Sequence, residues 1–197
     1  MQELVEGHIR RGIDVKQQVL SSRVDAITSA GLILASIFES GRKLLVCGNG
    51  GSAADAQHIA TEFLIRYKAE NVRPSLPAIS LAADSSALTA GGNDFGFDHI
   101  FARQVEGLGQ EGDGLLAITT SGNSANVLEA LRKAKEKKMF TFLLTGDTGG
   151  SIFAEHRALL DHVIRVPSTE TSRIQECHIM IGQIFCAIVE KEIYGLE

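Results

Sequence analysis

The sequence contains no tryptophan, only three prolines and only three cysteines. Cys47, Cys177 and Cys186 show no CxxC spacing and their number is odd, so a disulfide framework and a CxxC metal site are both excluded. Reduced thiols of this kind are typical of a cytoplasmic protein. No apolar run approaches the roughly 20 residues of a membrane helix, and the N-terminal segment MQELVEGHIRR is charged, unlike a signal peptide. We therefore expect a soluble, cytoplasmic protein without a membrane partner.

The sequence also lacks an excess of basic residues. The 19 lysines and arginines are outnumbered by 24 aspartates and glutamates, so the formal net charge is −5. This balance provides no general attraction to nucleic acid or to an anionic membrane, and we expect neither as a partner. A site for an anion must instead be built locally, from backbone N–H groups and hydroxyls. Hydrophobic residues make up 44% of the chain, which is ample for a buried core.

The order of apolar segments predicts a single domain over residues 1–197. Residues 1–40 show helical spacing of apolar positions, which predicts an arm of two helices with a break near Ser21 and a C-terminal cap at Gly41. Residues 41–197 alternate continuous apolar runs with amphipathic segments, as expected for strands covered on both faces of a parallel sheet. The predicted strands cover 43–48, 77–82, 114–120, 141–146 and 162–167. The predicted helices cover about 53–66, 98–109, 125–138, 150–157 and 171–193. This pattern predicts an α/β fold, a three-layer αβα sandwich on a five-stranded parallel sheet.

Two glycine- and serine-rich loops each follow a predicted strand and run into a predicted helix. In the first, 48-GNGGS-52, the glycines let the backbone approach an anion, and Ser52 is expected to be both a helix N-cap and a hydroxyl donor. In the second, 119-TTSGNS-124, hydroxyls cluster at the start of the next helix. Ligands bind at the carboxyl ends of parallel strands, where both loops are expected. Either loop alone is explained as an ordinary turn and cap, whereas the two together favour a phosphate site.

Other nucleotide-binding motifs fit the sequence less well. GNGGS is not a G-x-G-x-x-G motif followed by an acidic residue about 20 positions later, because Glu62 comes too early and lies inside the predicted helix. The P-loop pattern G-x-x-x-x-G-K-[ST] is absent from the sequence. A dinucleotide site and a Walker-type site are therefore both disfavoured.

His58 and Glu62 lie four residues apart, so they share one face of the predicted helix. An imidazole and a carboxylate at this spacing can form half of a divalent-metal site, which an amide oxygen could complete. Gln175 and Gln183 lie eight residues apart, near one face of the last predicted helix. Two other interpretations stay open, with Glu62 as a general base or with His58 and Glu62 as a plain surface pair.

The segment 91-GGNDFGF-97 places Asp94 between glycines, which predicts a loop that reaches a ligand, with a simple turn as the alternative. Arg66, Tyr67 and Arg73 follow the predicted helix that carries Glu62, and could contact a sugar or a phosphate. Long cationic side chains near a helix end are commonly just solvated, which is the other interpretation of these residues.

The motifs GNGGSAADAQHIATEF, TTSGNSANVLEAL, LTGDTGG and RIQECH, in this order, resemble the phosphoheptose isomerases of the sugar isomerase (SIS) domain superfamily. The resemblance covers nearly the whole chain. It implies a flavodoxin-like core and a homotetramer with active sites at the subunit interfaces. It also implies the conversion of sedoheptulose 7-phosphate to D-glycero-D-manno-heptose 7-phosphate, a precursor of lipopolysaccharide, and one zinc ion per subunit.

The resemblance also implies roles for single residues. The implied metal ligands are His58, Glu62 and Gln175, and Glu62 is the implied catalytic carboxylate. We expect Gln175 to complete the site from a neighbouring subunit and to contact the substrate. The other implied contacts to phosphate and sugar are Asn49, Gly50, Ser52, Asp94, Thr119, Thr120, Ser121 and Ser124.

Gln183 stands where the family pattern has a histidine that serves as metal ligand and proton-transfer partner. An amide oxygen can bind a metal weakly, but it cannot move a proton near neutral pH. His178, five residues earlier, points about 140° away around an ideal helix, so it is a poor substitute. Two non-catalytic alternatives stay open, namely a SIS protein that binds the replication initiator and a sugar-phosphate sensor. The GNGGS loop, Glu62 and the GNDFGF segment favour the isomerase over the initiator-binding protein.

Overall fold

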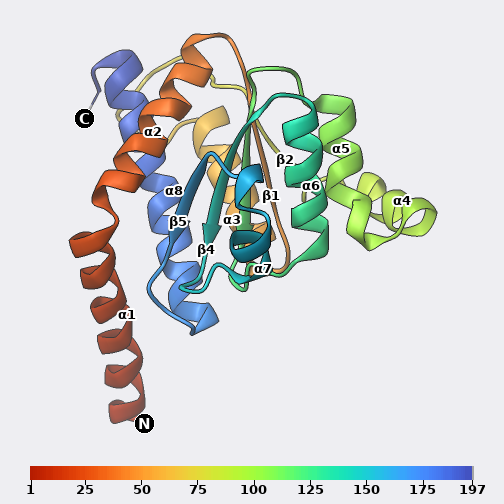
Figure 1. Ribbon diagram of the computed structural model, residues 1–197. Coiled ribbons are helices and arrows are strands. Elements are labelled where there is room, and N and C mark those ends of the chain that lie inside the picture. Colours follow the sequence, from red (N-terminus) through yellow and green to blue (C-terminus); the bar gives the residue numbers. More distant parts are fainter. Residues whose placement is uncertain (197) are drawn as a thin grey trace.

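A computed structural model describes residues 1–196 of the chain (Figure 1). Five parallel strands form one sheet in the order β2-β1-β3-β4-β5. They are β1 (Leu44–Gly48), β2 (Ala78–Ser80), β3 (Gly114–Thr119), β4 (Phe140–Thr145) and β5 (His162–Arg165). This is the flavodoxin-like order, in which the chain changes direction across the sheet between β1 and β3 and leaves a crevice at their carboxyl ends. The predicted α/β fold is confirmed, although β2 is shorter than the predicted strand 77–82.

Helices cover both faces of the sheet and make it a three-layer sandwich (Figure 1). Alternate residues of β1 show why, since Leu44 and Val46 join one buried cluster while Leu45 and Cys47 join the other. The first cluster is covered by α2 (Val24–Glu39), α3 (Gly51–Leu64) and α8 (Thr171–Tyr194). The second is covered by α5 (Ile100–Leu108), α6 (Ala125–Glu136) and α7 (Gly150–Glu155). Every residue of β1 and β3 is buried, as the continuous apolar runs predicted.

The first helix, α1 (Gln2–Ser22), projects from the sandwich as an arm (Figure 1). It is separated from α2 at Arg23, so the break predicted near Ser21 is confirmed. The C-cap of α2 is Ser40, one residue before the predicted Gly41; Gly41 follows it with φ +70°, and its N–H donates to the Phe38 carbonyl at 2.9 Å. Among the described residues, no single helix is long and apolar enough to cross a membrane, and α1 and α2 pass that test only as a pair bent by 74°.

One helix was not predicted from the sequence. The glycine-rich segment around Asp94, expected to be a loop, belongs to α4 (Ser85–Phe95). Asp84 begins this helix as its N-cap, with its carboxylate accepting from the N–H groups of Ser86 and Ala87 at 2.9 and 3.0 Å. This capping and the packing of α4 on α5 outweigh the low helix propensity of two adjacent glycines.

His178 in α8 lies fully inside the core. Burial lowers the pKa of its imidazole to about 4, and contact with the Thr145 backbone offsets only part of this effect. The unfolded chain therefore binds more protons than the folded chain between this pKa and the ordinary value near 6.5. It follows that His178 makes folding less favourable as the pH falls through this range.

We predict that His178→Gln makes the protein less sensitive to acid. Between pH 6.5 and pH 4, protonation of His178 on unfolding is expected to remove up to about 3 kcal/mol from the free energy of unfolding. Urea denaturation of wild type and variant at several pH values measures this difference, with the exposed His8→Gln as control. Parallel pH dependences for wild type and His178→Gln would contradict the prediction.

Candidate functional site

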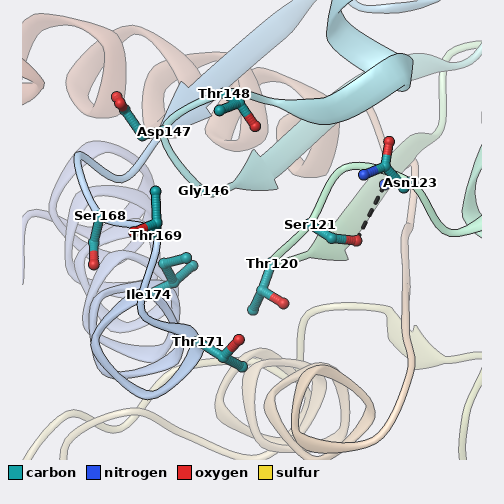
Figure 2. A pocket seen from close by; sticks show the side chains of 10 residues that line it. All are labelled: Thr120, Ser121, Asn123, Gly146, Asp147, Thr148, Ser168, Thr169, Thr171 and Ile174. Atoms are coloured by element: carbon teal, nitrogen blue, oxygen red, sulfur yellow. Dashed lines mark hydrogen bonds between the residues drawn. The ribbon is translucent and has the colours of Figure 1, made fainter.

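A cavity of about 270 Å³ opens at the carboxyl ends of β3, β4 and β5 (Figure 2). Three segments line it, namely the loop after β3, the loop after β4, and the connection from β5 into the first turn of α8. The lining residues are Thr120, Ser121, Asn123, Gly146, Asp147, Thr148, Ser168, Thr169, Thr171 and Ile174. The cavity therefore lies at the sheet edge where the sequence predicted a ligand.

The lining of this cavity is rich in hydroxyls and contains no lysine, arginine or histidine. Figure 2 shows threonine and serine side chains on opposite sides of the opening. The first turn of α8 adds the positive end of a 24-residue helix, with Thr171 as its first residue. Asp147, the one charged side chain in the lining, is exposed. Neutral donors of this kind can bind a phosphate group without basic side chains. This is the kind of anion site expected in a chain of net negative charge.

The second loop supplies Thr120 and Ser121 to the cavity, while Thr119 and Ser124 lie beneath it with their hydroxyls 3.0 Å apart. Gly122 allows this loop to touch the loop after β4. It has φ +67°, and a Cβ atom there would lie 1.9 Å from the carbonyl oxygen of Gly149. The shape of the cavity thus depends on contact between two glycine-containing loops.

The first loop does not line the cavity but is joined to the second loop's helix. The Asn49 and Asn126 side-chain amides exchange two hydrogen bonds of 2.8 Å. The N-cap of α3 is Gly50, at φ 55°, so the prediction of Ser52 as the cap is wrong. Because the chain turns at Gly50, Ser52 falls within the first helical turn, where its side chain is buried.

Gln175 reaches the first loop from α8 of the same chain. A Cβ atom on Gly51 would lie 2.2 Å from Gln175 Nε2, so the amide packs directly on the glycine. Within one chain Gln175 thus lies at the first loop, whereas its completion of the metal site of a neighbouring subunit stays a prediction. The connection within one chain arises because α3 and α8 both begin at the carboxyl edge of the sheet and pack side by side.

Helices α3 and α8 run parallel, which places Gln183 at about the same level along the interface as His58 and Glu62. At Gly182 a Cβ atom would lie 2.4 Å from Cδ1 of Ile59, so the two backbones approach closely at this level. His58 Nε2 and Glu62 Oε1 are 2.8 Å apart, with 48% and 16% of their side chains exposed. Burial raises the pKa of the Cys186 thiol, and the charge of Glu62 raises it further, which places the carboxylate close to α8.

Of the four predicted metal ligands, two of which are glutamines, the described part of the chain shows His58 and Glu62 in direct contact. Residues 1–196 contain no group of three histidine, cysteine, aspartate or glutamate side chains placed to hold a metal. Gln175 and Gln183 are about 12 Å apart along α8 at 1.5 Å per residue, and Gln175 packs on Gly51. The residues provide half a site at His58 and Glu62, with the Gln183 amide at the same level.

Asp94 lies away from the cavity. It is exposed on α4, where its carboxylate accepts a hydrogen bond of 2.7 Å from the Asn93 amide. The neighbours of α4 are α5 and the short helix η1 (Phe97–His99), on the side of the molecule opposite the arm (Figure 1). A single chain therefore does not bring Asp94 to the substrate cavity.

Sequence reasoning missed several residues of this region. Asp55 lies on α3 one turn before His58; burial raises its pKa to about 6, while the nearby His58 lowers it. The other missed residues are Asn123 in the loop after β3 and those that line the cavity after β4 and β5. A signal for them was present, since serine and threonine follow both strands just as they follow β3. The missed lining residues are Asn123, Asp147, Thr148, Ser168, Thr169 and Thr171.

The fold and the hydroxyl-lined cavity at the carboxyl edge of its sheet are those of a SIS-domain protein. The sequence model of the SIS domain matches residues 8–146. A phosphoheptose isomerase from Aneurinibacillus thermoaerophilus is 45% identical over 196 residues, which span 98% of this chain and 96% of that protein. A second, from Nitratiruptor, is 53% identical over 165 residues, covering 84% and 85% of the two chains.

Solved structures agree with these sequence relatives. The phosphoheptose isomerase of Neisseria gonorrhoeae superposes with a TM-score of 0.88 at 42% identity, covering 96% of this chain and 98% of that one. The chain belongs to the phosphoheptose isomerase family of SIS-domain proteins.

We predict that Gly122→Ala distorts the cavity, with Gly41→Ala as a matched control. Both glycines have φ near +70°, but nothing lies within 4 Å of the Cβ position at Gly41. Gly41→Ala is expected to cost about 1–2 kcal/mol from backbone strain alone. Gly122→Ala is expected to cost about 1–3 kcal/mol more because the new methyl overlaps Gly149.

Urea denaturation measures both losses of stability, and calorimetric titration with inorganic phosphate measures binding. Only Gly122→Ala is expected to weaken phosphate binding, by about tenfold or more, which corresponds to about 1.4 kcal/mol. Equal stability losses and equal phosphate affinities for the two variants would show that the loop contact does not shape the site.

Proposed function

We propose that this protein is a ketose–aldose isomerase that converts sedoheptulose 7-phosphate to D-glycero-D-manno-heptose 7-phosphate. Its relatives support an isomerase of sugar phosphates, because proteins named phosphoheptose isomerase match this chain over nearly their full length. The observation that carries the proposal is the hydroxyl-lined cavity beside the parallel pair α3 and α8, which bears Glu62 and Gln183. The proposed product serves lipopolysaccharide synthesis, and the proposed location is the cytoplasm, where buried thiols stay reduced.

The length of the substrate suits the spacing of the two parts of the site. The phosphate on C7 would occupy the cavity, and the carbon chain would extend along α3 towards its middle. His58 lies seven residues after Gly51, about 10 Å along the helix. Because a seven-carbon chain separates the phosphate from C1 and C2, the reacting carbons would come to the level of His58 and Glu62.

Glu62 is the proposed base that moves a proton between C1 and C2 through an enediolate. Its side chain is only 16% exposed, and His58 holds it by a 2.8 Å hydrogen bond, so the carboxylate has a defined direction. Gln183 can hydrogen-bond the substrate oxygens, but its amide cannot deliver a proton to them. The oxygen protons must therefore pass through another group or through the substrate's own hydroxyls.

Zinc is part of the proposal. His58 and Glu62 would hold it, because their donor atoms lie 2.8 Å apart, and the amide oxygen of Gln183 would add a weaker ligand. When bound, zinc would polarise the substrate carbonyl and stabilise the negative charge that forms on oxygen. This is the part of the chemistry that the Gln183 side chain does not perform.

We also propose that the chain forms a homotetramer in which a neighbouring subunit completes the active site. The arm supports this, because α1 exposes Val5, Ile9 and Ile13, each more than half accessible, in a stripe at intervals of four residues along one face of the helix. Asp94 supports it as well, since it lies outside the cavity of its own chain and would serve the site of another subunit.

We predict that the purified protein isomerises sedoheptulose 7-phosphate and that Glu62→Gln lowers kcat by roughly 10²–10⁴-fold. Gln183→His is expected to raise kcat by roughly 10²-fold, because it adds a titratable imidazole beside Glu62. Zinc content, measured by mass spectrometry, is expected to be close to one per chain in wild type and lower in Glu62→Gln.

The outcomes separate the alternative functions. Wild type and Gln183→His that both bind the sugar phosphate without turnover, with or without zinc, would favour a sensor. Capture of the replication initiator together with a lack of sugar-phosphate binding would favour the initiator-binding protein. Equal rates for wild type and Gln183→His would show that a histidine at this position is dispensable.

We predict that Ile9→Glu breaks the assembly through the arm. Ile9 is 58% exposed, so a charge there should leave the folded chain stable but prevent burial of the stripe between subunits. Sedimentation velocity is expected to show a tetramer for wild type and smaller species for the variant. The control is Val72→Glu, at an exposed apolar residue far from the arm in sequence. A monomeric wild type would contradict the proposed assembly.

A further inference from the structure

Arg73, in the connection between α3 and β2, forms a buried ion pair with Glu190 of α8. Arg73 Nε and Glu190 Oε1 are 2.7 Å apart, and the two side chains are 0% and 2% exposed. Arg73 is therefore neither solvated nor a contact for sugar or phosphate, the two roles that the sequence left open. A guanidinium withdrawn so completely from water must have all its donors occupied.

The remaining donors of Arg73 cap the end of α3. Its Nη2 donates to the backbone carbonyl of Glu62 at 2.7 Å, and its Nη1 donates to that of Phe63 at 2.9 Å. The last four carbonyls of a helix have no partner within the helix, and α3 ends at Leu64. Arg73 thus fixes the final turn of α3, the turn that carries the Glu62 side chain.

Both carboxylate oxygens of Glu190 accept hydrogen bonds. The Asn71 amide donates to Oε2 at 2.7 Å, while Arg73 and the more distant Tyr67 N–H occupy Oε1. Glu190 follows Gln183 by seven residues, so the two lie on the same face of α8. The contacts of Arg73 therefore join the end of α3 to the face of α8 that carries Gln183.

The electrostatics agree with this geometry. Burial is the main cause of the raised pKa of Cys186, and the charges of Glu62, Glu190 and Arg73 all act on the same thiol. Charged groups of α3, α8 and the connection after α3 therefore lie near one thiol between the two helices. At the other end of the contact, the packing of Ile59 on Gly182 sets the separation of the two helices.

We propose that Arg73, anchored by Glu190, is a positioning residue that sets the distance and direction of Glu62 relative to Gln183 and the bound substrate. The inference rests on the proposed function and adds to it a residue that does not touch the substrate. It explains why an arginine is used, since the planar guanidinium reaches four acceptors at fixed angles, the Glu190 carboxylate and three backbone carbonyls, whereas the ammonium of a lysine cannot span them together. A displacement of about 1 Å in a catalytic group can lower a rate by about 10²-fold.

Arg73→Lys tests the proposal, because it keeps the charge opposite Glu190 and removes the fork that caps α3. We expect kcat to fall about 10- to 100-fold, with KM and the affinity for inorganic phosphate nearly unchanged. Amide hydrogen exchange is expected to rise in the last turn of α3 and to stay unchanged in β1.

The matched control is Asp113→Asn. Asp113 is 1% exposed and pairs with Lys43 at 2.5 Å, but it lies at the amino ends of β1 and β3, opposite the site. Both variants are expected to lower the Tm, while only Arg73→Lys lowers kcat. If both variants lower the Tm and both keep kcat, Arg73 is merely structural and the proposal is overturned.

Different results would contradict the isomerase function and the positioning role of Arg73. Absence of turnover in wild-type protein, with or without zinc, would remove the isomerase function. Hydrogen exchange would still decide whether Arg73 orders the turn that carries Glu62. Unchanged exchange in the last turn of α3 of Arg73→Lys would overturn the positioning role, whatever the activity of the wild type.

Discussion

The close parallel packing of α3 on α8 is the constraint on which the rest of the site depends. Glycine makes this packing possible at two levels, since Gly51 admits the Gln175 amide and Gly182 admits Ile59. Arg73 and Glu190 then fix the far end of α3. Together these contacts connect the first loop, the pair of His58 and Glu62, and Gln183 along one interface between helices.

The composition of the chain restricts how this cavity can bind a phosphate. A protein with net charge −5 has no general attraction for a phosphate, and no cation lines this cavity. Binding must therefore come from hydroxyls, backbone N–H groups and helix N-termini directed at one point. Three parallel strands that end at the same edge provide this convergence, and the contact of Gly122 with Gly149 holds two of the loops together.

Much of the fold could be predicted because its signals are local. The five strands correspond to continuous apolar runs, and the two arm helices to the helical spacing that ends just before Gly41. The exceptions had identifiable causes. Helix α4 contains adjacent glycines, and its start depends on the Asp84 cap; Ser52 was displaced from its expected cap position because the chain turns at Gly50. The site was only partly predictable, since no local pattern by itself marks Asp147 and Ser168, in the loops after β4 and β5, as residues that line the cavity.

The sequence by itself determined the α/β class, the two phosphate-type loops, the pairing of His58 with Glu62, and the departure at Gln183. These follow from periodicity and short spacings, which the chain carries locally. Only the tertiary structure decided which loops line the cavity, that Gln175 packs on Gly51 of its own chain, and that Arg73 is buried against Glu190. The last two contacts join residues more than 100 positions apart, and they depend on how closely two helices approach, which no local pattern encodes.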